Sequence, residues 1–213
     1  MTTTDLCVLT GDIVASSKLS PRGLDAALDV LREGCAVAAG WSGNRAGFTR
    51  FRGDGWQSLG PEPEFALRAA LFLRARLGAA ELGSDTRISV AIGPGVVPDA
   101  GDLASASGPV FEMSGRNLDG MGRGRRLALG RVGPAAAGAA EEAVVALCDE
   151  ISGRWTARQA AVFALALQPG AGSQTEHAAK LGVSQQMIAK HLKAGGERAL
   201  RAALAAFEGP EAS

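Results

Sequence analysis

The sequence predicts an α+β protein with a sheet-and-helix domain over residues 1–152 and a small all-α domain over residues 153–213. Strand-length apolar runs alternate with helical apolar stripes in the first stretch, whereas the second stretch shows only helical patterns. A length of 213 residues with 46% hydrophobic content suits one medium domain followed by a small one. Charged content of 21% and a net charge of zero argue against a disordered or strongly basic chain.

Charge and cysteine usage narrow the class of protein further. From Arg154 onward, seven basic residues stand against four acidic ones, a sign that suits nucleic-acid binding. The chain start lacks the features of a signal peptide, and no apolar run approaches a membrane span, so we expect no membrane contact. The cysteines are few and widely spaced, which predicts reduced thiols in the core of a cytoplasmic protein: Cys7, Cys35 and Cys148.

The first domain begins with a strand, a helix and a hairpin. The strand is predicted over Asp5–Asp12, where an apolar run precedes an aspartate. Ser20 and Pro21 supply the N-cap and the first position of the helix. The hairpin is predicted over residues 47–59, because its centre holds residues that tolerate a tight turn: Gly53, Asp54 and Gly55.

The rest of this domain continues the alternation. Prolines and glutamates at residues 61–64 open the next helix, with carboxylates at its positive end. The elements predicted after it are a strand at Arg87–Gly93, a helix at Pro109–Leu118, a strand at Arg126–Leu129 and a helix at Ala135–Ile151. The order β-α-β-β-α-β-α-β-α is the beginning of a ferredoxin-like arrangement, which predicts an antiparallel sheet with helices packed on one face.

Two aspartates are predicted at the tips of neighbouring core strands. Asp12 ends the first strand, and Asp54 lies in the hairpin turn. Carboxylate oxygens are the ligands that hard divalent cations prefer, and two bridging metals would hold a triphosphate. The alternative is that each aspartate only bonds the backbone of its own turn.

Four segments, in order, resemble motifs of class III nucleotide cyclase domains. Thr10–Ser20 is similar to the opening motif of that family, an Asp-Ile pair followed by a small-residue turn and Leu-Ser. Phe51–Asp54 is similar to its Gly-Asp hairpin, and Ala91–Val97 to its glycine-bearing strand end. Gly108–Arg116 is similar to its last catalytic helix. The resemblance spans Asp5 to Ile151 and implies a cyclase-like fold.

The resemblance also implies a ligand, namely a purine nucleotide or cyclic nucleotide, with or without Mg²⁺ at Asp12 and Asp54. The further ligand-binding residues that it implies are Ser16, Ser17, Arg50, Glu112 and Arg116. Active members carry an asparagine at the position of Glu112 and, four residues on, the arginine kept here as Arg116. A carboxylate repels a triphosphate where an amide donates a hydrogen bond. We therefore interpret the domain as degenerate, with no catalytic residues; were it active, they would be Asp12, Asp54 and Arg116.

These side chains also have a plain structural interpretation. Arg50 and Arg116 could be ordinary solvated residues, and Glu112 could form an ion pair within its own helix. We interpret Trp56 as a packing residue rather than as a platform for a base.

The second domain carries helix-capping signals at regular intervals. Thr156 with Gln159 and Ser173 with Glu176 are spaced as capping boxes. The second box is followed by small and apolar residues at the spacing that a helix-turn-helix needs: Ala178, Gly182, Ile188 and Leu192. This stretch resembles the helix-turn-helix of the sigma-region-four and LuxR types. A last helix is predicted over Glu197–Glu208.

The resemblance places a recognition helix after Ser184, its N-cap. The outward residues that would contact DNA are Ser184, Gln185, Gln186, Met187 and Lys190. Glutamine can pair with adenine, and lysine contacts phosphate or guanine. The alternative is a helix pair that touches no DNA, or only protein.

We therefore predict a cytoplasmic, nucleotide-responsive transcription regulator that binds double-stranded DNA as a homodimer. Ligand binding to the cyclase-like domain would select one dimer geometry and so set the spacing of the recognition helices. Three alternatives stay open. The chain could be an active metal-dependent nucleotide cyclase or phosphohydrolase with an accessory helix-turn-helix. It could be a DNA-binding protein whose front domain only dimerises, or a protein-interaction adaptor.

Overall fold

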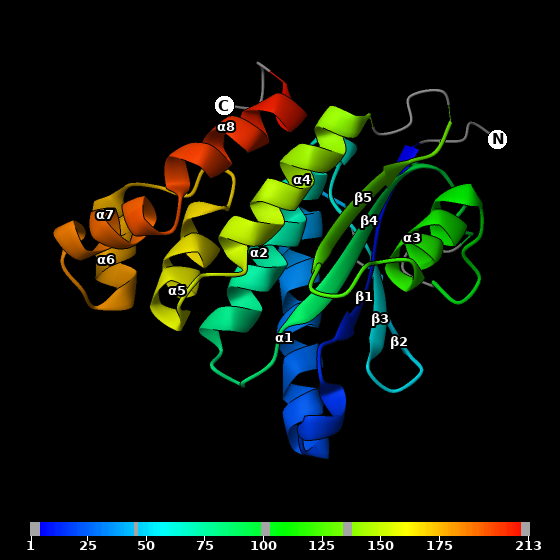
Figure 1. Ribbon diagram of the computed structural model, residues 1–213, viewed down its shortest axis with the longest axis horizontal. Helices are drawn as coiled ribbons and strands as arrows, with labels where there is room; N and C mark the ends of the chain where they lie inside the picture. Colours follow the sequence, from blue (N-terminus) through cyan, green and yellow to red (C-terminus); the bar gives the residue numbers. More distant parts are fainter. Residues whose placement is uncertain (1–4, 45–46, 99–102, 134–137, 210–213) are drawn as a thin grey trace.

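The structure, a computed structural model, describes residues 5–44, 47–98, 103–133 and 138–209 (Figure 1). Its strands and helices are β1 (Asp5–Ile13), η1 (Ser16–Lys18), α1 (Pro21–Gly40), β2 (Phe48–Phe51), β3 (Gly55–Leu59), η2 (Pro63–Phe65), α2 (Ala66–Ala79), β4 (Thr86–Pro94), α3 (Pro109–Asp119), β5 (Leu127–Arg131), α4 (Ala139–Ser152), α5 (Ala157–Ala166), α6 (Gln174–Leu181), α7 (Gln185–Ala194) and α8 (Glu197–Glu208). The predicted order of strands and helices is confirmed. The Ala135 at which the fourth helix was expected to begin lies outside the described residues.

Five strands form one sheet in the order β2-β3-β1-β4-β5. Neighbouring strands pair antiparallel, except that β4 and β5 pair parallel, with Ile88 opposite Leu127. The expectation of a wholly antiparallel sheet is therefore wrong at this edge. The chain passes from β4 to β5 through a crossover that contains α3, and such a crossover brings the second strand back in the same direction.

Successive residues of β1 face different layers of the molecule. Leu9 joins the main core together with Leu28 and Leu31 of α1. The next residue, Thr10, instead has its hydroxyl 2.8 Å from that of Ser114 on α3. Helices α1, α2 and α4 thus lie on one side of the sheet and α3 on the other (Figure 1). The expectation of helices on one face only is wrong because α3 buries its own small apolar cluster against the opposite face.

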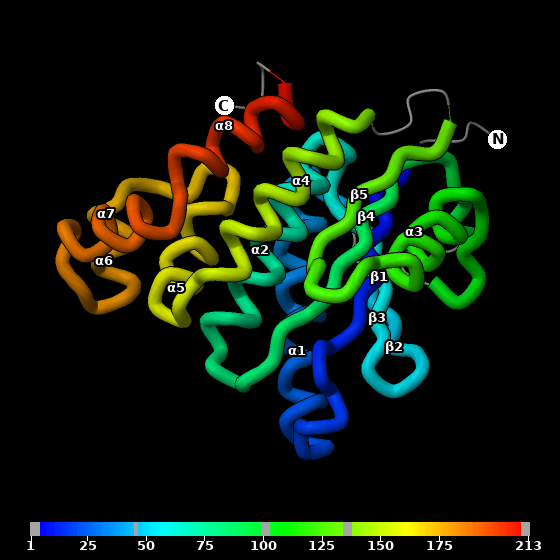
Figure 2. Tube along the Cα trace, viewed as in Figure 1, coloured from blue at the N-terminus to red at the C-terminus, as the bar shows by residue number. Residues whose placement is uncertain are grey.

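Helix α2 is the centre of the packing. Ten of its residues are buried, and they surround the helix axis instead of forming one stripe, which is the pattern of a helix covered on all sides. One side of α2 faces α1 and the sheet, and the other faces α5. The tube trace shows α5 beside α2, with α8 passing near α4 (Figure 2). The helical segment α5–α8 thus packs directly on α2, while the division into domains at residue 152 stays a prediction.

The local signals read from the sequence are confirmed. Ser20 caps α1, and Thr156 and Ser173 each form a complete capping box. Trp56 is a packing residue, fully buried, and its Nε1 donates to the Thr86 hydroxyl at 3.1 Å. The cysteines are free thiols buried in the core: Cys7, Cys35 and Cys148. In the part of the chain that the structure describes, no helix combines the length and apolarity that a membrane crossing needs.

Candidate functional site

The two predicted carboxylates come from neighbouring strand ends. Asp12 lies opposite Gly55, the first residue of β3, and Asp54 directly precedes it. The Ile13 amide also donates to the Asp54 carbonyl at 3.3 Å, which joins the end of β1 to the hairpin turn. The two aspartates therefore lie at neighbouring strand ends at the same end of the sheet.

Asp12 does not stand free at this edge. It lies directly opposite Arg87 of β4, whose Nε donates to the Asp12 Oδ1 at 2.9 Å while its Nη2 binds Oδ2. This hydrogen bonding to Asp12 raises the pKa of the Arg87 guanidinium; partial burial opposes the shift, and the charges of Asp12, Asp119 and Asp54 add to it. Neither Arg87 nor Asp119 is among the site residues predicted from the sequence.

Asp54 has a partner of its own. The Ser16 hydroxyl donates to the Asp54 Oδ2. Ser16 begins the short η1 turn, which follows Ala15 in the left-handed region at φ 54°. The neighbouring Ser17 is exposed. Of the two serines expected to bind ligand, the structure joins Ser16 to Asp54.

Glu112 and Arg116 lie on α3, and they pair with each other. Arg116 Nη2 is 4.0 Å from Glu112 Oε2, and the two side chains are 75% and 74% exposed. A pair this exposed contributes at most about 1 kcal/mol. Helix α3 is held through Ser114 on the same sheet face as Asp12, so the helix that carries Arg116 lies on that face.

Arg50 is directed to the other face of the sheet. It lies opposite Trp56, whose side chain is in the main core on the α1 side. Its Nη1 donates to the Asp25 Oδ1 of α1 at 2.8 Å, and its Nε donates to the Gly53 carbonyl. The structure therefore gathers Asp12, Ser16 and Asp54 but does not bring Arg50 to them.

The donor set at this edge does not fit a divalent cation. Mg²⁺ requires near-octahedral oxygen ligands, and both carboxylate oxygens of Asp12 bind Arg87. Among the described residues, no group of three or more His, Cys, Asp or Glu side chains is arranged to hold a metal.

The second candidate site is the outer face of α7. Helices α6 and α7 are joined by Gly182, at φ 65° and ψ 33°, and the Ser184 hydroxyl accepts from the Met187 amide at 3.3 Å. Ile188 and Leu192 are 0% and 1% exposed, so they fix the inner face of the helix. The residues expected to contact DNA all lie on the exposed side: Ser184, Gln185, Gln186, Met187 and Lys190.

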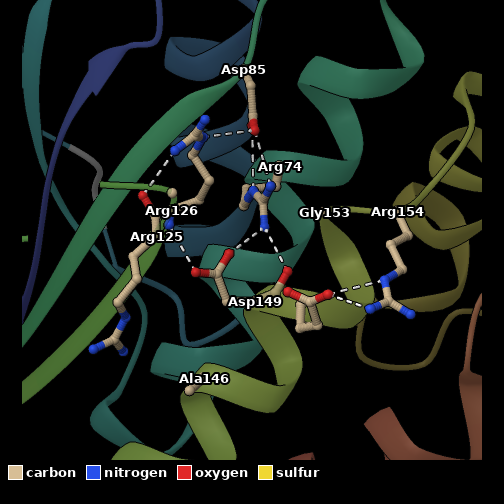
Figure 3. Close-up of a pocket in the computed structure, with 10 residues that line it drawn as sticks. Arg74, Asp85, Arg125, Arg126, Ala146, Asp149, Gly153 and Arg154 are labelled. Carbon is tan, nitrogen blue, oxygen red and sulfur yellow. Dashed lines mark hydrogen bonds and ion pairs between the residues drawn. The ribbon is translucent and has the colours of Figure 1, made fainter. Parts of the chain in front are cut away.

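One polar pocket was not foreseen. It encloses about 480 Å³ between α2, the loop before β5, α4 and the start of the helical segment. Within it, Arg74 donates to Asp149 at 3.0 Å and to Asp85 at 3.0 Å (Figure 3). Asp149 also accepts from the Arg126 amide at 2.8 Å, so the cluster ties three elements together. Partners 75 residues apart leave no local sequence pattern.

Known proteins with a similar sequence or structure were compared with the chain. No protein-family model and no curated protein matches the chain. Similar solved structures include a bacterial light-regulated adenylyl cyclase, with 16% identity, TM-score 0.45, 61% of this chain and 77% of that chain covered. The guanylyl cyclase Cya2 has 16% identity and TM-score 0.42, with 61% and 76% covered. A further structure of a bacterial light-regulated adenylyl cyclase has 16% identity and TM-score 0.46, and the match covers 69% of this chain and 45% of that chain. At this level of similarity the function has to be inferred from the side chains themselves.

Proposed function

We propose that the chain is a DNA-binding transcription regulator in which α7 enters the major groove and the sheet domain binds a purine nucleotide without turning it over. The observation that carries the proposal is the division of α7 into two faces. Its inner face is fixed by buried Ile188 and Leu192, while the polar side chains of Gln185, Gln186 and Lys190 are exposed. Within the described chain, none of those three side chains makes a hydrogen bond or ion pair, so all are free to read base edges.

The charge around α7 supports this proposal. Exposed cations surround it on α5, α6 and α7: Arg158, Lys180, Lys190 and Lys193. Glu176 is the one acidic residue between Arg154 and Glu197, and its carboxylate is occupied by the Ser173 amide at 2.6 Å. The surface near the recognition helix is therefore positive, as phosphate contacts require.

DNA binding is tested by fluorescence anisotropy with a labelled duplex of about 30 base pairs at several salt concentrations. We expect Lys190→Ala to weaken binding to all sequences and to reduce the salt slope by about one. Gln186→Ala should instead change the preference among sequences obtained by selection from a random pool. Arg22→Ala is the matched control, because Arg22 is exposed at the start of α1, a helix that lies apart from α7 (Figure 1). Equal binding by all three variants, or binding indifferent to salt, would contradict the proposal.

The nucleotide part of the proposal is supported by the placement of Asp12 and Asp54 at neighbouring strand ends, by the bond of Ser16 to Asp54 and by the exposed Arg116 on α3. We propose a homodimer in which the ligand selects one arrangement of the two recognition helices. Thermal unfolding with mononucleotides, cyclic mononucleotides and cyclic dinucleotides tests the binding. A ligand at a hundred times its Kd stabilises the folded state by about 2.7 kcal/mol.

The readouts separate this function from its alternatives. A nucleotide that raises the melting temperature without being converted to product supports a sensor. Arg116→Ala should remove this shift, and Arg125→Ala should keep it. Product formation lost in Asp54→Asn would make the domain a cyclase or phosphohydrolase. DNA affinity indifferent to every nucleotide would reduce the front domain to a dimerisation unit.

A further inference from the structure

Arg87 is fixed opposite Asp12 by the register of the two central strands. Leu9 and Val90 lie opposite each other in the same pair of strands, and both are buried in the main core. A slip by one residue would move these side chains to the face that α3 covers and would bring Thr10 or Ser89 into the main core, so the register is strongly specified. The contact between Arg87 and Asp12 is therefore set by the core and not by the freedom of a surface loop.

The contact involves both oxygens of the Asp12 carboxylate. Arg87 binds Oδ1 through Nε at 2.9 Å and Oδ2 through Nη2, the parallel two-bond arrangement in which guanidinium fits carboxylate best. The side chains of Arg87 and Asp12 are 31% and 21% exposed, so water screens the pair only in part. A cation that approached Asp12 would meet a carboxylate whose charge is already neutralised and would be repelled by the guanidinium bound at both oxygens.

The charges around Arg87 indicate that, without it, the strand end that carries Asp12 would attract cations. The charges of Asp12, Asp119 and Asp54 all act on the Arg87 guanidinium. One guanidinium thus experiences the charge of three carboxylates, of which it contacts Asp12 directly. A carboxylate such as Asp12 attracts Mg²⁺ or Mn²⁺ when no cationic side chain neutralises it.

We propose that Arg87 is the resident cation of this edge and decides which ligands it accepts: it keeps divalent cations off Asp12, so that a nucleotide binds here without a metal ion. The binding of a nucleotide without a metal ion rests on the proposed function. The exclusion of divalent cations rests on the contact between Arg87 and Asp12 alone.

The test is a titration of the full-length protein with Mn²⁺, with free Mn²⁺ measured by electron paramagnetic resonance. We expect the wild-type protein to bind no stoichiometric Mn²⁺ up to about 1 mM. Arg87→Gln removes the positive charge and frees both oxygens, so it should gain a site that binds Mn²⁺ at least about tenfold more tightly. Asp12→Asn combined with Arg87→Gln should lose that gain. Arg125→Gln, which removes an arginine of the separate polar pocket, is the control and should behave as the wild type.

Two results overturn the inference. One is wild-type binding of Mn²⁺ that Asp12→Asn abolishes, a measurement that needs no Arg87 variant. The other is a folded Arg87→Gln protein, judged by circular dichroism, that gains no Mn²⁺ site. Should Arg87→Gln not fold, the wild-type titration decides alone.

A second measurement separates this inference from the proposed function. Nucleotide-induced stabilisation is compared in EDTA and in Mg²⁺. We expect the two shifts to be equal. A shift that requires Mg²⁺ and Asp12 would overturn the role of Arg87 while supporting nucleotide binding. Absence of any shift would overturn nucleotide binding, and the Mn²⁺ titration would still test Arg87.

Discussion

Arg68 of α2 and Glu208 of α8 form a two-bond ion pair across 140 residues of sequence, with Nε to Oε1 at 2.5 Å and Nη2 to Oε2 at 2.6 Å. Their side chains are 17% and 3% exposed. Arg68 also donates to the Leu167 carbonyl after α5 at 3.2 Å. One arginine of the central helix α2 thus holds both the first and the last helix of the segment α5–α8.

Removing one partner of this pair should destabilise the whole molecule. Arg68→Met leaves the Glu208 carboxylate buried without a partner, and we expect a loss of about 3 kcal/mol in the free energy of unfolding by urea. The double variant Arg68→Met with Glu208→Leu should recover most of that loss. Arg201→Met, which breaks an exposed pair with Glu197, is the control and should cost below about 1 kcal/mol. Equal losses for the buried and the exposed pair would contradict this role.

Gly11 should tolerate no side chain. A Cβ at this position would lie 2.5 Å from Cζ2 of the buried Trp56. We expect Gly11→Ala to lower the free energy of unfolding by about 2 kcal/mol or more, because neither the strand backbone nor the indole can move away. Gly115→Ala is the matched control, since a Cβ there meets nothing within 4 Å, and it should stabilise α3 by about 0.5 kcal/mol. A neutral Gly11→Ala would mean that the edge beside Asp12 is looser than the structure shows.

Gly182 should be needed for its backbone conformation alone. It adopts φ 65°, and a Cβ there would meet nothing within 4 Å. Gly182→Ala should therefore cost about 1 kcal/mol through backbone strain, whereas Gly182→Asn should cost less because asparagine enters this region more readily. Both are measured by urea unfolding. If DNA affinity also falls in the order Gly, Asn, Ala, the turn between α6 and α7 positions the recognition helix; an unchanged affinity would speak against that.

The buried thiols should be inert in the folded protein and should weaken it at alkaline pH. Burial raises the pKa of Cys7 and Cys35 to about 12 and that of Cys148 to about 11, from 9.0. The raised folded-state pKa means that each thiol contributes fully below pH 9 and that its contribution falls as pH rises further, by up to about 1.4 kcal/mol per pH unit.

The thiols are tested with a thiol-reactive chromophore at pH 8, where we expect no reaction before unfolding and three thiols after it. Unfolding free energies measured from pH 8 to pH 11 should fall, and Cys148→Ala should fall less steeply. Rapid labelling of the folded protein would show that one cysteine is open to solvent.

The sequence determined what depends on neighbours within a few residues. Ser20, Ser173 and Ser184 were recognised as caps because each bonds an amide three residues on, and Gly182 because the turn needs a positive φ. Asp12 and Asp54 could be placed at adjacent tips because a strand end and a hairpin turn are both local patterns.

Only the tertiary structure decided what those aspartates face. The partner of Asp12 is Arg87, 75 positions away, and it follows from the pairing of β1 with β4. The position of Arg50 on the α1 side of the sheet likewise depends on strand register. The parallel pairing of β5 with β4 depends on the crossover between them. A side chain's face on a sheet alternates with every residue, so contacts between distant strands are fixed only when the core chooses one register.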